Sequence, residues 1–210
     1  MPDIRDISEF RPFFQSKGYR RMPITKDWLE ETISLRAGLI TTENNPGKFR
    51  RLILGLNILF DGLKEELGQE RLHQFVRALE ALILPSPGET KKKFVHRCQT
   101  FNLANDKTRS CLKEAYDMRS DTEHMNPWDR RMQRYPINQR EDTCWHRTRQ
   151  IEQLACVTYS RLLLDPVLRE HFKTDETIKA FWNKKDHESQ ALWGVPIDIT
   201  LEPLEPDFLS

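Results

Sequence analysis

An arginine and a histidine, Arg119 and His124, lie five residues apart shortly before Pro127. A histidine side chain transfers protons near neutral pH, and an arginine guanidinium pairs with phosphate oxygens. His124 falls in the last turn of a predicted helix, where unpaired carbonyl groups favour a protonated imidazole. Together the two side chains have the chemistry needed to act on a phosphodiester.

Structural roles compete with this catalytic interpretation. Arg119 lies only about 20° around the predicted helix from Leu112, so it continues a core-facing stripe and is either paired, extended toward water or placed at an interface. Arg119 and Glu123 have the i, i+4 spacing of a helical salt bridge, and His124 stands where a helix end is capped. Because Arg119 and His124 are about 140° apart around the helix, they share a site only through the reach of the arginine or across a two-fold axis.

The segment Tyr116–His124, with the sequence YDMRSDTEH, resembles the R-x4-H motif of the HEPN superfamily, whose members are α-helical bundles. The resemblance extends over roughly residues 49 to 164. It implies metal-independent RNA cleavage, in which the ribose 2′-OH attacks the adjacent phosphate and leaves a 2′,3′-cyclic phosphate and a 5′-OH. His124 would then be the general base or acid, Arg119 would stabilise the pentacovalent phosphate, and Ser120 would hydrogen-bond to a phosphate. Many family members carry Asn, Asp or His directly after the arginine, whereas this chain carries Ser120.

The same resemblance implies partners. The HEPN cleft usually forms across a homodimer, so we expect a homodimer that binds RNA, needs no cofactor, and acts as a toxin or phage-defence effector. An antitoxin or another regulatory protein is a further expected partner. Because some family members lack activity, the alternative is a non-catalytic helical module that binds a protein, a nucleotide or RNA. A DNA-binding regulator is a third alternative, although no convincing helix-turn-helix pattern is present.

Arginines interleaved with aromatic residues follow the motif. This pattern suits single-stranded RNA, because arginines pair with phosphates and aromatic rings stack on bases. It is also typical of a surface loop held in place by packing of its tryptophans and tyrosines, and of a dimer interface. We predict that the RNA-binding residues are Trp128, Arg130, Arg131, Arg134 and Tyr135, and we assign Arg140, Trp145, Arg147 and Arg149 to the same loop.

Other polar residues carry weaker signals. The run Lys91–Lys93 is interpreted as an exposed helix start rather than a phosphate site, although a partner role is also open. Cys144 and His146 match no common zinc-ligand spacing, so no metal site is predicted. Four other histidines show no catalytic spacing: His73, His96, His171 and His187.

The composition is that of a folded cytoplasmic protein. The chain has 210 residues, a net charge of +1 and 31% charged residues, which fits one domain with an appendage and excludes a wholly basic nucleic-acid coat. Its four cysteines form no C-x-x-C pair, and its first residues show no signal-peptide pattern, so we expect reduced thiols. No apolar run approaches ~18 residues, so no membrane partner is expected.

Apolar residues recur at helical spacing along most of the chain. One stripe runs from Leu52 to Leu67 and is expected to end at Gly68, and a second runs from Leu72 to Ile83. Because the join between them is very short, the two helices are predicted to form an antiparallel hairpin. Further helices are predicted over about residues 89–101, 112–125, 151–162, directly after Pro166, and over 176–182.

The predicted fold class is therefore all-α: an up-down helical bundle of four to five core helices with peripheral helices and an extended acidic C-terminal tail. The predicted divisions are an N-terminal extension that packs on the bundle (1–45), a HEPN-like bundle (46–194) and the tail (195–210). Within the extension, Asp27 and Glu30 are expected to cap a helix over residues 28–39. Residues 195–199 are the one stretch with strand character.

Overall fold

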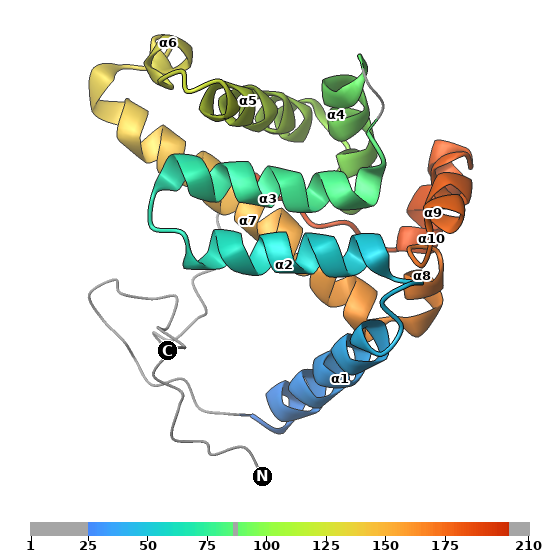
Figure 1. The fold of residues 1–210 in the computed structure, drawn as a ribbon. Helices are drawn as coiled ribbons and strands as arrows, with labels where there is room; N and C mark the ends of the chain where they lie inside the picture. Colours follow the sequence, from blue (N-terminus) through green and yellow to red (C-terminus); the bar gives the residue numbers. More distant parts are fainter. Residues whose placement is uncertain (1–24, 86–87, 202–210) are drawn as a thin grey trace.

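The computed structural model describes residues 25–85 and 88–201, and these residues form the predicted all-α fold (Figure 1). Predicted features of residues 1–24 and 202–210, including most of the acidic tail, lie outside the described residues. The helices follow one another as α1 (Lys26–Glu43), α2 (Arg50–Lys64), α3 (Gly68–Ile83), α4 (Thr90–Phe101), α5 (Asp106–Glu123), α6 (Asp129–Met132), the 3-10 helix η2 (Ile137–Gln139), α7 (Arg140–Leu164), α8 (Pro166–Glu170), α9 (Asp175–Trp182) and α10 (Asp186–Trp193).

Helix α3 lies at the centre of the bundle, with α2, α4, α5 and α7 packed around it (Figure 1). It forms the predicted antiparallel hairpin with α2. Leu72, Phe75 and Leu79 of α3 are fully buried, and complete burial of such a side chain contributes about 1.5–3 kcal/mol. Because its apolar stripe is buried in the core, α3 can meet the candidate site residues of α5 only with its remaining faces.

A close approach in the core joins α2, α3 and α7. The hydroxyl of Tyr159 on α7 donates a hydrogen bond to the carbonyl oxygen of Ala78 on α3 at 2.7 Å, and Tyr159 is 1% exposed. A Cβ atom at Gly55 of α2 would overlap this hydroxyl. Glycine at position 55 is therefore required by the close approach of the tyrosine.

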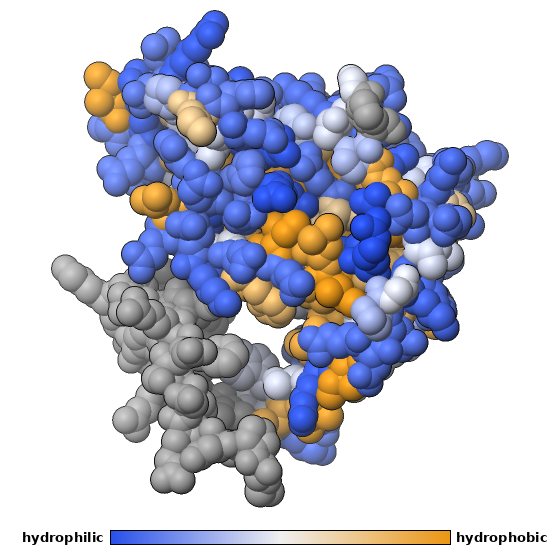
Figure 2. Space-filling model, in the orientation of Figure 1, coloured by the Kyte–Doolittle hydropathy of each residue, from blue (hydrophilic) through white to orange (hydrophobic). Residues whose placement is uncertain are grey.

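The peripheral helices flank this core. Helix α1 packs along α7, and α8 to α10 gather near the end of α3 that leads into α4 (Figure 1). Figure 2 shows apolar surface over α1 and α2, whereas the part of this face formed by α5 and α6 is mostly hydrophilic. No helix among residues 25–85 and 88–201 is both long and apolar enough to cross a membrane.

The first helical hairpin differs from the prediction at its join. Helix α2 ends at Lys64 rather than at Gly68, which instead begins α3. The reason is local: the carboxylate of Glu65 accepts hydrogen bonds from the backbone N–H groups of Glu66 and Leu67 at 3.0 and 3.1 Å. These bonds stabilise the turn between the two helices, because the carboxylate satisfies backbone N–H groups that lie after the end of α2 and before the start of α3.

The predicted cap of α1 was wrong. Thr25, not the pair Asp27 and Glu30, is the N-cap, and its hydroxyl accepts a hydrogen bond from the backbone N–H of Trp28 at 3.2 Å. Threonine is a good N-cap because its short side chain reaches back to the orphan N–H groups of the first turn. Asp27 lies inside that first turn, where its charge favours the helix dipole.

The stretch with strand character forms an isolated bridge rather than a sheet. Ile197 pairs in parallel with Asn102 at the end of α4, and the backbone N–H of Leu103 donates to the carbonyl oxygen of Ile197 at 2.6 Å. The side chain of Asn102 also accepts a hydrogen bond from the N–H of Ile199 at 3.1 Å. The segment after α10 is therefore fixed against the end of α4.

Candidate functional site

The R-x4-H segment occupies the C-terminal end of α5. The helix begins at a capping box, in which Asn105 Oδ1 accepts from the N–H of Thr108 (2.9 Å) and Thr108 Oγ1 accepts from the N–H of Asn105 (3.2 Å). It ends at His124, which is its C-cap, and Met125 follows with a positive φ of 55°. Arg119 therefore lies within the helix, while His124 marks the point where the chain leaves it.

Arg119 is directed at α3. Its Nη2 atom donates to Glu80 Oε2 at 3.0 Å, and its Nη1 atom donates to the carboxylate of Glu123 one turn further along α5. The side chains of Arg119 and Glu80 are only 13% and 12% exposed. The i, i+4 pair with Glu123, expected as the structural alternative, is thus present and is extended by a second carboxylate from α3.

Two α3 residues that the sequence analysis missed as neighbours of Arg119 are Glu80 and His73. Burial raises the pKa of the Glu80 carboxyl, and the nearby Arg119 opposes this rise. Burial also lowers the pKa of His73, and the charge of Arg119 lowers it further. Among the described residues, the buried atoms Arg119 Nε, Glu80 Oε1 and His73 Nδ1 have no hydrogen-bond partner. The signal that could have found them is their i, i+7 spacing on α3, which places both on one side of that helix.

The structure does not bring His124 into this cluster. Its backbone N–H donates to the carbonyl oxygen of Ser120 at 3.1 Å, while its side chain is exposed at the helix end. By helical geometry His124 lies about 40° from Ser120 and about 140° from Arg119. Within this one chain, Ser120 and His124 therefore share a side of α5 that Arg119 does not.

The aromatic residues predicted to stack on RNA bases pack against α5 instead. Trp128 is 6% exposed, and its indole N–H donates to the carbonyl oxygen of Met118 at 2.9 Å and to Thr122 Oγ1 at 3.0 Å. The hydroxyl of Tyr135 contacts both carboxylate oxygens of Glu114 at 3.2 and 3.1 Å. This is the arrangement expected for a surface segment held by its tryptophan and tyrosine.

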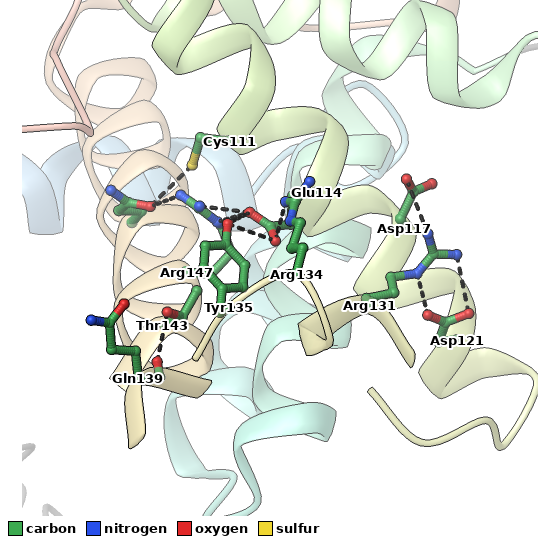
Figure 3. A network of polar contacts seen from close by, with 11 residues as sticks. Cys111, Glu114, Asp117, Asp121, Arg131, Arg134, Tyr135, Gln139, Thr143 and Arg147 are labelled. Carbon is green, nitrogen blue, oxygen red and sulfur yellow. Dashed lines mark hydrogen bonds and ion pairs between the residues drawn. The ribbon is translucent and has the colours of Figure 1, made fainter. Parts of the chain in front are cut away.

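The arginines of this segment pair with an acidic stripe on α5 (Figure 3). Arg131 Nη2 donates to Asp121 Oδ1 at 3.2 Å, and Arg131 Nη1 lies 3.3 Å from Asp117 Oδ2. Arg134 pairs with Glu114. The three carboxylates have i, i+3 and i+7 spacing, so they line one side of α5. Arg130 is exposed and makes no ion pair within the part of the chain that the structure describes.

Glu114 is the centre of this network. Its side chain is 4% exposed and also accepts hydrogen bonds from Arg147 Nε at 3.0 Å and Arg147 Nη2 at 2.6 Å. Arg147 is not in a loop as predicted: α7 begins at Arg140, so Arg140, Trp145, Arg147 and Arg149 are all helical. A buried carboxylate needs such partners because desolvation of an unpaired charge costs several kcal/mol.

The cysteines are free thiols in the positions expected of packing residues. Cys98 and Cys111 are buried, and Cys144 and Cys156 are half-buried. Burial raises the pKa of Cys156 to about 12, so this thiol stays protonated at neutral pH and is a poor nucleophile. Within residues 25–85 and 88–201, no group of three His, Cys, Asp or Glu side chains gathers in a way that could hold a metal ion.

Comparison with known proteins adds no relative. No family model, no curated protein and no solved structure matches the chain. Membership of the HEPN superfamily therefore stays a prediction that depends on the R-x4-H segment and the helical fold around it.

Proposed function

We propose that this chain is a HEPN-like helical module that binds RNA without cleaving it, and that Arg119 belongs to the framework of its fold. The observation that carries this proposal is the placement of Arg119 between Glu80 and Glu123. A guanidinium that stabilises a pentacovalent phosphate must present its N–H groups to the phosphate oxygens. Here those groups already bind two carboxylates, and an approaching phosphate would meet more negative than positive charge.

An exposed aromatic platform supports RNA as the partner. Trp145 at the start of α7 is 56% exposed, and the guanidinium of Arg149 lies 5.0 Å from the centre of its ring. An exposed ring flanked by a cation suits a stacked base with its phosphate, because every base has a π-face. The platform belongs to the arginine-rich and aromatic set predicted from the sequence, although it lies on a helix.

The test combines binding with cleavage. A fluorescently labelled single-stranded RNA is titrated with the wild type, Trp145→Ala and Trp28→Ala, the last being a matched control because Trp28 on α1 is 52% exposed. We expect Trp145→Ala to weaken binding about tenfold, as for the loss of one stacked base, and Trp28→Ala to change it less than about twofold. The RNA should remain intact in EDTA. Equal binding by all three proteins, or cleavage by the wild type, would contradict the proposal.

The second candidate is a metal-independent endoribonuclease, acting as a toxin or phage-defence effector under an antitoxin or other regulatory partner. It is favoured by the exposed imidazole of His124 at a helix end and by the 46% exposure of Glu123, which a phosphate could displace from Arg119. Because Arg119 and His124 face different sides of α5, this candidate requires a homodimer that brings Arg119 of one copy to His124 of the other.

Cleavage assays separate the two candidates. If the chain is a ribonuclease, wild-type protein yields 2′,3′-cyclic phosphate ends in EDTA, and His124→Ala abolishes this activity while the helical circular dichroism is unchanged. Glu123→Gln should then increase the activity, because it removes a competitor for the guanidinium. His187→Ala is the matched control, since His187 is also an exposed histidine. Retained cleavage by His124→Ala would exclude this mechanism.

A further inference from the structure

A basic groove lies between α4 and α5, away from the ion pairs of Arg119. It has a volume of about 750 Å³, which is within the range of ligand sites. The basic side chains that line it are Lys91, Lys92, His96, Arg109 and Lys113. The one acidic residue in its lining is Glu89, whose carboxylate lies 3.6 Å from Lys93 Nζ and is therefore already paired.

Two of the lining lysines are left without a carboxylate among the described residues. Lys91 pairs with Asp117 at 2.7 Å, Arg109 Nη1 lies 3.7 Å from Asp106 Oδ1, and His96 lies 3.1 Å from Asp186. Lys92 and Lys113 are exposed and make no ion pair among residues 25–85 and 88–201. The groove therefore has a surplus of positive charge, which raises the local concentration of anionic ligands.

A buried amide in the groove points to the same class of ligand. Gln99 of α4 is 8% exposed and lines the groove, yet its Nε2 atom is buried without a hydrogen-bond partner among the described residues. An unsatisfied buried donor costs about 1–3 kcal/mol, and rotation of the Gln99 amide toward the groove would let a ligand that supplies an acceptor recover part of this. Ammonium, guanidinium and amide N–H groups are all donors. The ligand they fit is an anion with several acceptor oxygens, which is the chemistry of a phosphate.

The groove continues along α5 as a track rather than closing as a pocket. A second hollow of about 290 Å³ shares Lys91 and Lys113 with the groove and reaches Arg131 and Arg134 beside α6. Its carboxylates, Glu114 and Asp117, already bind arginines and Lys91. A track of this kind matches a series of phosphates better than a single one, as in proteins that follow the backbone of a single strand.

We propose that the α4–α5 groove binds the phosphate backbone of single-stranded RNA, with Lys92 and Lys113 contacting phosphates and Gln99 donating to a phosphate or ribose oxygen. This inference rests on the proposed RNA-binding function and adds to it the surface that the strand follows. By helical geometry His124 lies about 20° around α5 from Lys113, so a strand in the track approaches the side of the helix that carries the exposed imidazole.

The experiment compares two charge-reversal variants with equal net charge. Lys92→Glu/Lys113→Glu alters the groove, and Lys48→Glu/Lys64→Glu alters two exposed lysines beside and on α2. Binding of labelled single-stranded RNA is measured at several salt concentrations. We expect the groove variant to bind at least about tenfold more weakly and to reduce the slope of log affinity against log salt by about 1.4, which is about 0.7 for each phosphate that a lysine no longer neutralises. The α2 variant should bind like the wild type.

A third variant tests the amide without changing charge. Gln99→Leu removes the unsatisfied donor while keeping a side chain of similar size, so it should fold at least as well as the wild type and bind RNA more weakly with an unchanged salt slope. If the wild type binds RNA but the groove variants bind equally well, this inference fails and the proposed function stands. If the wild type binds no RNA, or binds only free nucleotides such as ATP, both fail.

Discussion

In the C-terminal half of α5, Arg119 is held between Glu80 and Glu123, whereas in the N-terminal half Lys113 faces an open groove with no carboxylate partner in the described part of the chain. The same difference separates Arg131, which binds Asp117 and Asp121, from Lys92 across the groove. One helix thus carries cations that stabilise the fold and cations that remain available to a ligand. Residue type alone does not separate the two groups, because Lys91 pairs with Asp117 whereas the exposed Arg130 makes no ion pair among the described residues. A neighbouring carboxylate makes the difference.

The largest expected effect comes from breaking the ion pairs of Arg119. Arg119→Ala leaves Glu80 buried without its cation, so we expect a loss of about 3 kcal/mol in the free energy of unfolding, measured by urea denaturation with circular dichroism. The double variant Arg119→Ala/Glu80→Gln should recover part of this loss, because the remaining partner is then neutral. If Arg119→Ala were as stable as the wild type, Arg119 would not be a framework residue and the ribonuclease candidate would gain.

The next largest effect is expected at Glu114. Glu114→Gln removes the charge that holds Arg134 and Arg147 and should cost about 2 kcal/mol, since the two guanidinium groups lose their shared buried partner. The segment from α6 to η2 should also become more sensitive to limited proteolysis. Arg134→Ala is the control: its side chain is 56% exposed, so its removal should cost under about 1 kcal/mol. A larger loss for Arg134→Ala than for Glu114→Gln would reverse this assignment.

A smaller, pH-dependent effect is expected at His73. The pKa of His73 in the folded protein is lowered from 6.5. Between that lowered pKa and pH 6.5, the unfolded chain therefore binds more protons than the folded protein does. Stability contributed by neutral His73 is therefore present above pH 6.5 and is lost as the pH falls through this window. His73→Gln should show less loss of stability than the wild type between pH 7 and the lowered pKa. The pKa of Glu80 is raised, so its contribution to stability changes with pH in the opposite direction. Because Glu80 is present in both proteins, this contribution cancels when their stabilities are compared.

The smallest effect on stability is expected in the groove. Lys92→Glu/Lys113→Glu should change the free energy of unfolding by less than about 0.5 kcal/mol, because both side chains are exposed and neither makes an ion pair among the described residues. Thermal unfolding at low and high salt provides the measurement. A large destabilisation would mean that these lysines stabilise the fold, which would remove the difference between the two halves of α5.

Much of the fold was predictable because it follows from apolar spacing. The stripes that predict α2 and α3 contain residues such as Leu52 and Leu72, which are fully buried, and the short join correctly predicted their antiparallel hairpin. The boundary at Gly68 was wrong because the decisive contact, in which the Glu65 carboxylate accepts hydrogen bonds from the backbone of the turn between α2 and α3, has no periodic signature. The hydrophobic pattern determines which face of a helix is buried, whereas single polar contacts determine the residue at which the helix ends.

The candidate site was less predictable because it depends on tertiary pairing. The i, i+4 pair between Arg119 and Glu123 could be expected from sequence, but Glu80 lies 39 residues before Arg119 and meets it only once α3 and α5 pack. Likewise, the arginines after the motif bind an acidic i, i+3, i+7 stripe that lies upstream on α5. The spacing of this stripe is visible in the sequence, but the helical face that meets the α6 segment is not.

The tyrosine hydroxyl seated against Gly55 has a consequence for motion. Because α2, α3 and α7 meet there with no spare volume, these three helices cannot slide past one another without breaking the hydrogen bond to Ala78. Any rearrangement that accompanies the proposed RNA binding must therefore occur away from this contact, for example in the short helix α6. Among the described residues, amide exchange on a scale of hours should therefore be slow around this contact and faster at α6.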